Sequence, residues 1–395
     1  MKKIILVAFA ISMMFSAVAQ ENVKVGPYKL KKICDNVTTS VKDQNRTGTC
    51  WAWSTLATLE SDIIKNGKAD KTLELSTMWV ARNAYFEKFV KYVRMQGNVI
   101  FDEGGAAHDV PFIIAKYGIV PQKDYKALEY GEKNHVHAEM LAVLKSYADV
   151  LIKNPNGKLT TVWQDAVNNI LDAYFGKRPS TITVDSVEYT PLEYAAHLGI
   201  TDTKYVAFAS STAYPYGEMF VYEVPDNWNW GEFMNVPLKE FTQIAIDAVK
   251  NGYTIAWGTD VSDLGFKFRD GFAVYPDVEK ENVAGMERAK WEKMNSVDKN
   301  KALFSKVVKE KVITPEYRQE LFDNYTATDD HGMQIVGLYK AADGSLFFKV
   351  KNSWTENSAA KGFFYVSMPF FEALTMNYML NVEALNADVK AKYLK

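Results

Sequence analysis

The chain contains only two cysteines, and one of them, Cys50, stands in a segment that could do chemistry. The stretch around it reads RTGTCWAWS, with small residues before the thiol and two tryptophans after it. Gly48 and Thr49 predict that a loop enters a helix at Cys50. Partial positive charge and unpaired N–H groups at a helix N-terminus lower the pKa of a thiol. Cys50 is therefore a candidate nucleophile, and a buried cysteine that caps a core helix is the alternative.

A thiolate needs a cationic partner to persist at neutral pH, and His331 could supply it. His331 lies at the predicted start of a strand, and Asn352 ends the partner strand of the same predicted hairpin. The turn sequence Ala341–Gly344 falls at the midpoint between these two residues. Opposed side chains in a hairpin lie about 5 Å apart, so the asparagine could orient the imidazole. The alternative is a surface histidine and an unrelated turn asparagine.

The elements that must position these residues are predicted to be helical early in the chain and extended late in it. Apolar residues at spacings of three and four begin at Trp51 and stop at Asn66-Gly67. The same periodicity returns in residues 136–144, 163–174 and 190–199. Aromatic and β-branched runs typical of strands occupy residues 253–258, 266–275, 333–340, 346–352, 362–368 and 378–382. Segments 124–238 and 278–325 are interpreted as largely helical insertions within a single domain.

The N-terminus has the features of a secretory signal peptide. Lys2 and Lys3 precede an apolar run from Ile4 to Phe15, and Ala17-Val18-Ala19 matches a small-x-small cleavage site. The apolar run is too short to span a membrane, and no later run predicts a membrane span. Residues 1–19 are therefore expected to be removed, and residues 20–395 are expected to work in a periplasm or outside the cell.

The composition excludes several classes of function. With 48 % hydrophobic and 13 % aromatic residues, the chain is expected to be globular rather than disordered. A formal net charge of −2, or −4 without the two leader lysines, gives no electrostatic footprint for nucleic acid or for an anionic membrane. Two cysteines and five scattered histidines suggest no zinc site, so neither a metal nor a cofactor is expected. His135 and His137 are expected on a solvated surface, and Cys34 is expected to be a free, partly buried thiol.

Four segments follow one another in a fixed order: Gln44 lies six residues before Cys50, and the sequences Asp330-His331 and Asn352-Ser353-Trp354 come much later. These segments resemble the glutamine, cysteine, histidine and asparagine boxes of papain-like cysteine peptidases. The resemblance implies that Cys50 is the nucleophile and that His331 carries the proton. It also implies that Asn352 orients the imidazole, that Trp354 shields this hydrogen bond, and that Gln44 with the Cys50 N–H stabilises the tetrahedral oxyanion.

The spacing of the motifs is similar to that of one branch of this family. His331 lies 281 residues after Cys50, whereas the usual gap is roughly 130–150 residues. The excess matches the two insertions, and the chain lacks further cysteines for the disulfides usual in secreted members. Both departures, together with Asp102-Glu103-Gly104-Gly105, resemble the bleomycin hydrolase/aminopeptidase C branch. Thr355 follows Trp354 where the family usually has glycine.

The resemblance implies an α+β, papain-like two-lobed fold, with a helical lobe, an antiparallel β-barrel-like lobe and large helical insertions. It implies hydrolysis of peptide bonds through an acyl-enzyme, without a cofactor, and assembly into a homo-oligomer, a hexamer in relatives. Peptide substrates would approach Gly104 and Gly105, where missing side chains leave room for their backbone. We expect an exported aminopeptidase, with a papain-like endopeptidase or a catalytically silent peptide-binding relative as alternatives.

The C-terminal arm, the 13 residues Glu383–Lys395, bears on this choice. In relatives of the aminopeptidase C type, the arm lies in the active-site cleft and its carboxylate can meet the ammonium group of the substrate. Fully extended, the arm here could span roughly 40 Å and cross a cleft. The composition equally permits a surface helix over Ala387 to Tyr393, which would shorten its reach to a fraction of that distance.

Overall fold

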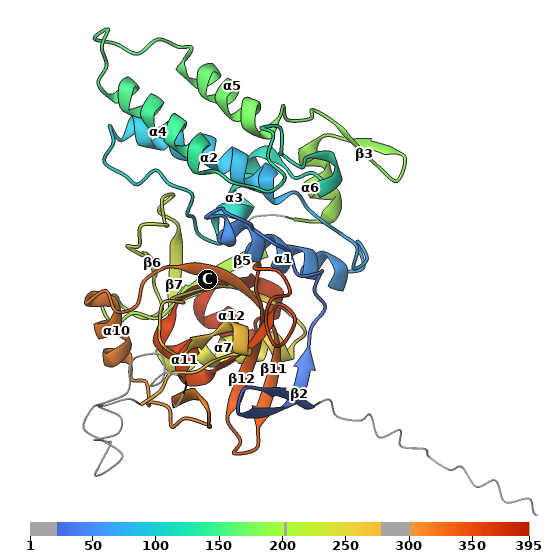
Figure 1. The fold of residues 1–395 in the computed structure, drawn as a ribbon, viewed down its shortest axis with the longest axis vertical. Coiled ribbons are helices and arrows are strands. Elements are labelled where there is room, and N and C mark those ends of the chain that lie inside the picture. Colours follow the sequence, from blue (N-terminus) through green and yellow to red (C-terminus); the bar gives the residue numbers. More distant parts are fainter. Residues whose placement is uncertain (1–21, 201–203, 278–300, 302, 395) are drawn as a thin grey trace, which may run out of the picture.

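The computed structural model describes residues 22–200, 204–277, 301 and 303–394 (Figure 1). The expected signal peptide, residues 1–19, and residues 278–300 and 302 of the expected helical insertion 278–325 lie outside the described part of the chain. Two regions are evident in Figure 1: helices fill one end of the molecule and a large sheet with its covering helices fills the other. Within the described ranges, no helix combines the length and the apolar character that crossing a membrane requires.

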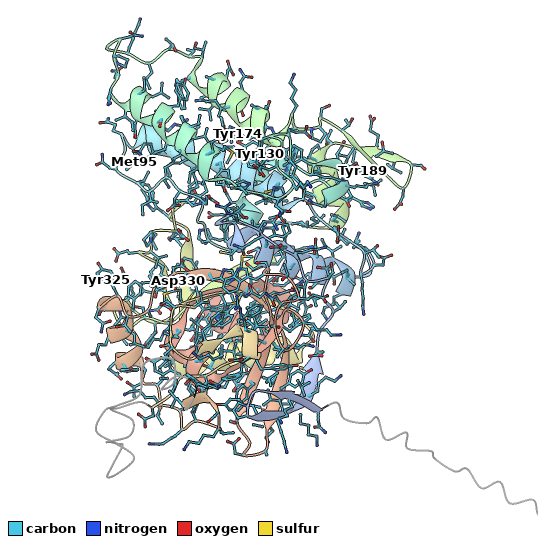
Figure 2. All side chains as sticks on the ribbon, viewed as in Figure 1. Met95, Tyr130, Tyr174, Tyr189, Tyr325 and Asp330 are labelled. Atoms are coloured by element: carbon cyan, nitrogen blue, oxygen red, sulfur yellow. The ribbon has the colours of Figure 1, made fainter. Side chains whose placement is uncertain are left out.

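The helical region is built from the first half of the chain. Its helices are α1 (Cys50–Lys65), α2 (Thr77–Arg94), α3 (Asp109–Tyr117), α4 (Ala138–Ile152), α5 (Trp163–Phe175) and α6 (Pro191–Leu198). All four predicted helices are confirmed. The signals at α6 show why: Thr190 and Glu193 form a reciprocal capping box, and Gly199 ends the helix in the left-handed conformation at φ 74°. Aromatic side chains fill the space between these helices, as Tyr130 and Tyr174 show with ring centroids 5.7 Å apart (Figure 2).

The other region contains a sheet of 12 strands, and a separate two-stranded hairpin lies in the helical region. The strand order is β6-β7-β5-β14-β8-β11-β12-β13-β10-β9, and β2 pairs with β11 while β1 pairs with β2. The bounds are β1 (Asn22–Val25), β2 (Tyr28–Asp35), β3 (Ile182–Val184), β4 (Val187–Tyr189), β5 (Tyr205–Ala209), β6 (Met219–Val221), β7 (Glu232–Asn235), β8 (Ile255–Thr259), β9 (Phe266–Lys267), β10 (Phe272–Ala273), β11 (His331–Ala341), β12 (Leu346–Lys351), β13 (Phe363–Ser367) and β14 (Thr375–Asn381). The α+β papain-like fold class is confirmed, but the sheet is open and mixed, because β5–β7 and β10–β13 are parallel pairs.

The segment 124–238 is less purely helical than its sequence pattern indicates. It contains α4, α5 and α6, but β5, β6 and β7 also lie in it, and β5 pairs with β14 of the large sheet. These strands are three to five residues long, and runs of that length carry little periodicity. The segment therefore contributes both to the helical region and to one edge of the sheet.

β11 and β12 form the predicted hairpin, and its register brings His331 and Asn352 within a few positions of each other. Gln334 lies opposite Lys351, and the turn closes with a hydrogen bond of 2.8 Å from the Ala341 N–H to the Ser345 carbonyl. Gly344 occupies the turn at φ 97°, a conformation that favours glycine. On one face of β11, the α-carbon of Gly332 lies so close to α1 that an added Cβ would come within 2.8 Å of Ser54 Oγ. The start of α1 is thereby held against the start of β11.

The opposite face of the sheet is covered by α7 (Leu238–Lys250) and α11 (Met368–Leu374). Tyr378 of β14 points to this face, where its hydroxyl donates to the Phe241 carbonyl at 2.8 Å. The described helices that remain are α10 (Pro315–Asp323) and α12 (Ala387–Tyr393), with short 3₁₀ turns at Gln122–Asp124, Phe268–Asp270 and Val382–Ala384. Because α7 and α11 cover one face of the sheet, the candidate active site is formed on the other face of β8, β11 and β14, which is turned toward α1.

The C-terminal arm adopts the helical alternative. Residues 387–393 form α12, whose Lys392 pairs with Glu240 of α7 at 2.8 Å. Tyr393 is buried and donates to the same Glu240 carboxylate at 2.6 Å. The described part of the arm, up to Leu394, is therefore anchored on α7.

Candidate active site

Cys50 is the first residue of α1, as the small residues before it predict. Its neighbouring tryptophans fix the loop that leads into the helix. Trp51 donates its indole N–H to the Glu103 carbonyl at 3.1 Å, and Trp53 donates to Thr49 Oγ at 3.2 Å. The two tryptophans that follow the thiol therefore hold the N-terminus of α1 in place. Cys50 lies at this N-terminus, where the helix carries partial positive charge.

His331 and Asn352 meet at the end of the hairpin, as the turn position predicts. His331 Nε2 lies 2.8 Å from Asn352 Oδ1, which also accepts the Ser353 N–H at 2.7 Å. An amide oxygen accepts, so Nε2 carries the proton and Nδ1 is left as an acceptor. The indole of Trp354 stacks on the imidazole, with ring centroids 4.4 Å apart and planes inclined by 25°. Trp354 thus covers the His331–Asn352 pair, in the position that the resemblance implies.

Burial shapes the electrostatics of the thiol and the imidazole. Burial raises the pKa of the Cys50 thiol, and the Gly332 backbone N–H opposes this shift. Burial lowers the pKa of His331, while its hydrogen bond to Asn352 acts in the opposite direction. Neither charge is stable here alone, so a thiolate at Cys50 requires an imidazolium beside it.

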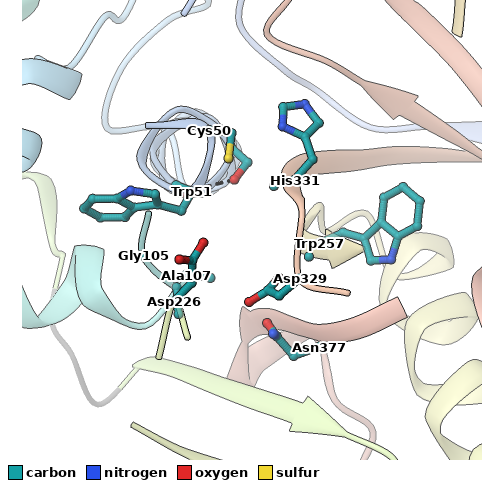
Figure 3. Close-up of a pocket in the computed structure, with 13 residues that line it drawn as sticks. Cys50, Trp51, Gly105, Ala107, Asp226, Trp257, Asp329, His331 and Asn377 are labelled. Carbon is teal, nitrogen blue, oxygen red and sulfur yellow. Dashed lines mark hydrogen bonds between the residues drawn. The ribbon is translucent and has the colours of Figure 1, made fainter. Parts of the chain in front are cut away.

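Cys50 and His331 open into one pocket, which Figure 3 shows from close by. Three polar side chains that the sequence patterns did not single out also line it: Asp226, Asp329 and Asn377. Asp329 is adjacent to the Asp330-His331 motif, so its position could have been inferred from the sequence. Asp226 and Asn377 come from the β6–β7 connection and from β14, and no local signal marks them.

The two glycines expected to meet substrate lie beside this pocket. A Cβ added to Gly105, which lines the pocket, would come within 2.8 Å of the Trp51 ring. A Cβ added to Gly104 would come within 2.1 Å of Asp226 Oδ1. The missing side chains therefore admit Trp51 and Asp226, and the substrate-binding role of the two glycines stays a prediction.

Gln44 is buried between the two segments that carry the candidate residues. Its amide N–H donates to the Thr47 carbonyl at 2.7 Å, and its Oε1 accepts from Ser353 Oγ at 2.7 Å. One amide hydrogen remains for another acceptor. The side chain therefore links the loop before Cys50 to the Asn-Ser-Trp motif, and its part in an oxyanion hole stays a prediction.

We expect the substitution Gln44→Ala to lower kcat by roughly 10²–10³-fold, as the loss of one oxyanion donor does. Iodoacetamide should still alkylate Cys50, because the thiol is retained. Ser353→Ala is the matched control, since it breaks the bond to Gln44 but keeps the amide donor. An equal loss of turnover in both variants would assign Gln44 a purely structural role.

Two expectations for other residues can be compared with the structure. His135 and His137 are buried, not solvated, because they precede α4 beneath the helical region, where His137 Nδ1 lies 3.0 Å from the Tyr85 hydroxyl. Cys34 is free and half-buried, with its Sγ 3.7 Å from the Val249 carbonyl. Among the described residues, no group of three or more His, Cys, Asp or Glu side chains is arranged to hold a metal ion.

Known proteins resemble this chain in sequence and in fold. The family of papain family cysteine proteases matches residues 30–189, and the peptidase C1-like family matches residues 312–395. An aminopeptidase C of Lactobacillus delbrueckii subsp. lactis is 24 % identical over 400 residues, covering 90 % of this chain and 82 % of that protein. An aminopeptidase C of Lactococcus lactis subsp. cremoris is 24 % identical over 389 residues, covering 89 % of this chain and 83 % of that protein.

A crystal structure of pepw from Lactobacillus rhamnosis hn001 (dr20) has the same fold, with a TM-score of 0.67 at 20 % identity. The match covers 92 % of this chain and 85 % of that one. The two family matches contain all the candidate residues, Gln44 and Cys50 in the first and His331 and Asn352 in the second. The chain is therefore a papain-like cysteine peptidase.

Proposed function

We propose that this chain is an exported aminopeptidase that removes N-terminal residues from peptides through a Cys50–His331 pair and an acyl-enzyme. The observation that carries the proposal is that Cys50, at the start of α1, and the oriented imidazole of His331 line one pocket. The names of the relatives support the aminopeptidase activity. The leader over residues 1–19 supports export, and the hexamer of the resemblance stays a prediction.

The proposed reaction begins when His331 Nδ1 takes the proton of the Cys50 thiol. The thiolate then attacks the carbonyl carbon of the first peptide bond, and the Cys50 N–H with the Gln44 amide stabilises the oxyanion. The imidazolium gives its proton to the departing amine, which leaves as the shortened peptide. Water, deprotonated by His331, hydrolyses the thioester and releases the N-terminal amino acid.

The bond between His331 and Asn352 serves both halves of this cycle. It holds the imidazole in the tautomer with an unprotonated Nδ1, ready to accept a proton. It also raises the pKa of His331 against the effect of burial, which favours the imidazolium intermediate. Stacking of Trp354 keeps water from competing for this bond.

A comparison of two fluorogenic substrates tests the proposed activity. We expect a leucine amide of a fluorogenic amine, with its α-amino group free, to be hydrolysed at least about 10-fold faster in kcat/KM than its N-acetyl form, a difference of about 1.4 kcal/mol. Pretreatment with iodoacetamide should abolish both reactions. A preference for the N-acetyl form would contradict the aminopeptidase activity and favour an endopeptidase.

A further inference from the structure

Two carboxylates face the Cys50 pocket and have no part in the bond-breaking steps. Asp226 reaches it from the connection between β6 and β7, and Asp329 reaches it from the segment before β11 (Figure 3). Negative charge at both raises the pKa of the Cys50 thiol beyond the effect of burial. Each carboxylate therefore stands within electrostatic range of the candidate nucleophile. This placement is unfavourable for a thiolate unless something of opposite charge joins the pocket.

Asp329 lacks a partner among the residues that the structure describes. It makes no hydrogen bond or ion pair with them, and its charged neighbours are Asp226 and Asp330. Burial, together with the negative charge of these two neighbouring carboxylates, raises the pKa of Asp329 to about 8. An unpaired carboxylate in such a place is costly, so its presence calls for a ligand that compensates it.

Asp226 lies beside Gly104 and Gly105 in the wall of the Cys50 pocket. Its carboxylate lies where a side chain of Gly104 would be, and the Gly105 N–H counteracts the burial that raises the pKa of Asp226 to about 7. Lys88 also lowers this pKa, but the lysine itself is bound to the carbonyls of Asp102 and Gly104, at 2.7 and 2.6 Å. Asp226 is therefore fixed in position and only partly compensated.

Asn377 is an independent sign that a polar group belongs in this pocket. Its side chain is 96 % buried, since 4 % is exposed, and it points into the pocket (Figure 3). Its amide makes no hydrogen bond with any described residue. The next residue of β14, Tyr378, points to the α7 face and is fully bonded there. The polar atoms of Asn377 are not among the fully buried unpaired ones, so they open into the pocket and are available to a polar ligand there.

The surrounding charges favour a cation as that ligand. The nearby histidines, His331 and His108, are both held neutral near pH 7 by burial, which lowers the pKa of each. Lys88 is a cation that acts on Asp226, but it does not line the pocket. Three oxygen-bearing side chains from three separate segments thus converge on a space whose described lining contains no lysine or arginine.

We propose that Asp226, Asp329 and Asn377 bind the α-ammonium group of the substrate and thereby make the peptidase specific for free N-termini. This inference deepens the proposed aminopeptidase activity and rests on it. In an N-terminal residue the α-nitrogen lies about 2.5 Å from the carbonyl carbon that the thiolate attacks. The ammonium must therefore bind beside Cys50, where these side chains lie. Its positive charge also offsets the two carboxylates, which favours the thiolate when a correct substrate is bound.

The anchored C-terminal arm is consistent with this assignment. α12 is fixed on the α7 side of the sheet by its contacts with Glu240, whereas Asn377 faces the other side. Asp226, which belongs to the inserted segment 124–238, supplies a carboxylate at the pocket. An N-acyl group would place a neutral carbonyl beside Asp226 and Asp329. The carboxylates would repel the carbonyl oxygen, and their own charge would stay uncompensated.

The test compares the wild type with Asp329→Asn and Asp226→Asn, two changes that remove charge and keep shape. For each variant, kcat/KM is measured on the free-amine leucine substrate, on its N-acetyl form and on an N-acetyl-lysine analogue. We expect a loss of about 10- to 100-fold on the free-amine substrate, as for one charged hydrogen bond, and no loss on the N-acetyl form. Asp323→Asn is the matched control: its exposed carboxylate on α10 accepts from Gln319 Nε2 at 2.9 Å and lies outside the pocket lining.

A second measurement separates recognition from damage to the fold. Alkylation of Cys50 by iodoacetamide at pH 9, where both carboxylates are above their pKa values of about 7 and about 8, should be as fast or faster in both variants, because a charge that raises the thiol pKa is gone. Damage to the site would slow it. Asn377→Ser provides a further variant, with a weaker loss on the free-amine substrate expected.

The outcomes are distinct for the two proposals. If the wild type favours N-acetyl substrates, the aminopeptidase proposal itself fails. If the wild type favours free amines and both aspartate variants keep that preference, the ammonium assignment is wrong while the activity stands. A loss confined to the N-acetyl-lysine substrate would also overturn the assignment, because the pocket would then bind a basic side chain.

Discussion

Replacing Cys50 with serine is expected to lower kcat/KM on free-amine peptides by about 10⁴-fold or more. A serine hydroxyl holds its proton far more tightly than a thiol, and burial at this position already disfavours the anion. The exchange of sulfur for oxygen changes little volume at a half-buried helix start, so the melting temperature should stay within about 2 °C. Activity assays and thermal unfolding on the same preparations check both expectations.

Cys34→Ser is the matched control, because Cys34 is the other free thiol of the chain. It lies on β2, where its pKa is raised by burial, and it contacts the Val249 carbonyl rather than the pocket. We expect this variant to keep wild-type turnover and to be inactivated by iodoacetamide at the wild-type rate. A Cys50→Ser enzyme with more than roughly a hundredth of wild-type activity would refute the nucleophile assignment.

The residues that carry the chemistry were predictable because each lies in a strong local signal. The small residues before Cys50 predict a helix start, and α1 begins at that residue. The turn at Ala341–Gly344 determines the pairing of β11 with β12. That pairing brings His331 and Asn352 to the same end of the hairpin, 21 residues apart in sequence and 2.8 Å apart in space.

The residues that surround this chemistry were not predictable in the same way. Asp226 and Asn377 reach the pocket only because the β6–β7 connection and β14 are placed beside α1 by long-range pairing, which no short pattern reports. The burial of His137 depends in the same way on α2, whose Tyr85 contacts it, and His135 packs against His137. The residues proposed to determine specificity are therefore brought together by tertiary contacts, whereas the catalytic residues lie in motifs that are local in the sequence.

The helical C-terminal arm is compatible with the proposed aminopeptidase activity. The 13-residue arm was consistent with either a cleft-crossing strand or a helix. The helix is favoured because Asn386 caps it by accepting the Val389 N–H at 2.9 Å. Glu240 then binds both Lys392 and Tyr393 and fixes its position. In the ammonium-binding site proposed above, Asp226 and Asp329 supply the carboxylates.

Replacing His331 with alanine is expected to reduce kcat/KM by about 10⁴-fold or more, as removal of the proton carrier does in such pairs. The variant keeps the Cys50 thiol but removes the imidazolium that a thiolate needs in this buried setting. Iodoacetamide should therefore alkylate Cys50 far more slowly at pH 6 in the variant than in the wild type, with the difference shrinking as pH rises toward the pKa of the isolated thiol. His197→Ala, which removes an exposed histidine of α6, is the control and should leave both rates unchanged.

The double variant Cys50→Ser/His331→Ala shows whether the two residues act as one unit. If the proton of Cys50 passes to His331, the second substitution has nothing further to remove, and the double variant should be no slower than the worse single variant by more than about threefold. Multiplied losses would mean that the two side chains act in independent steps. Wild-type alkylation at pH 6 in His331→Ala would mean that the helix N-terminus alone activates the thiol, and His331 would then serve only the departing amine.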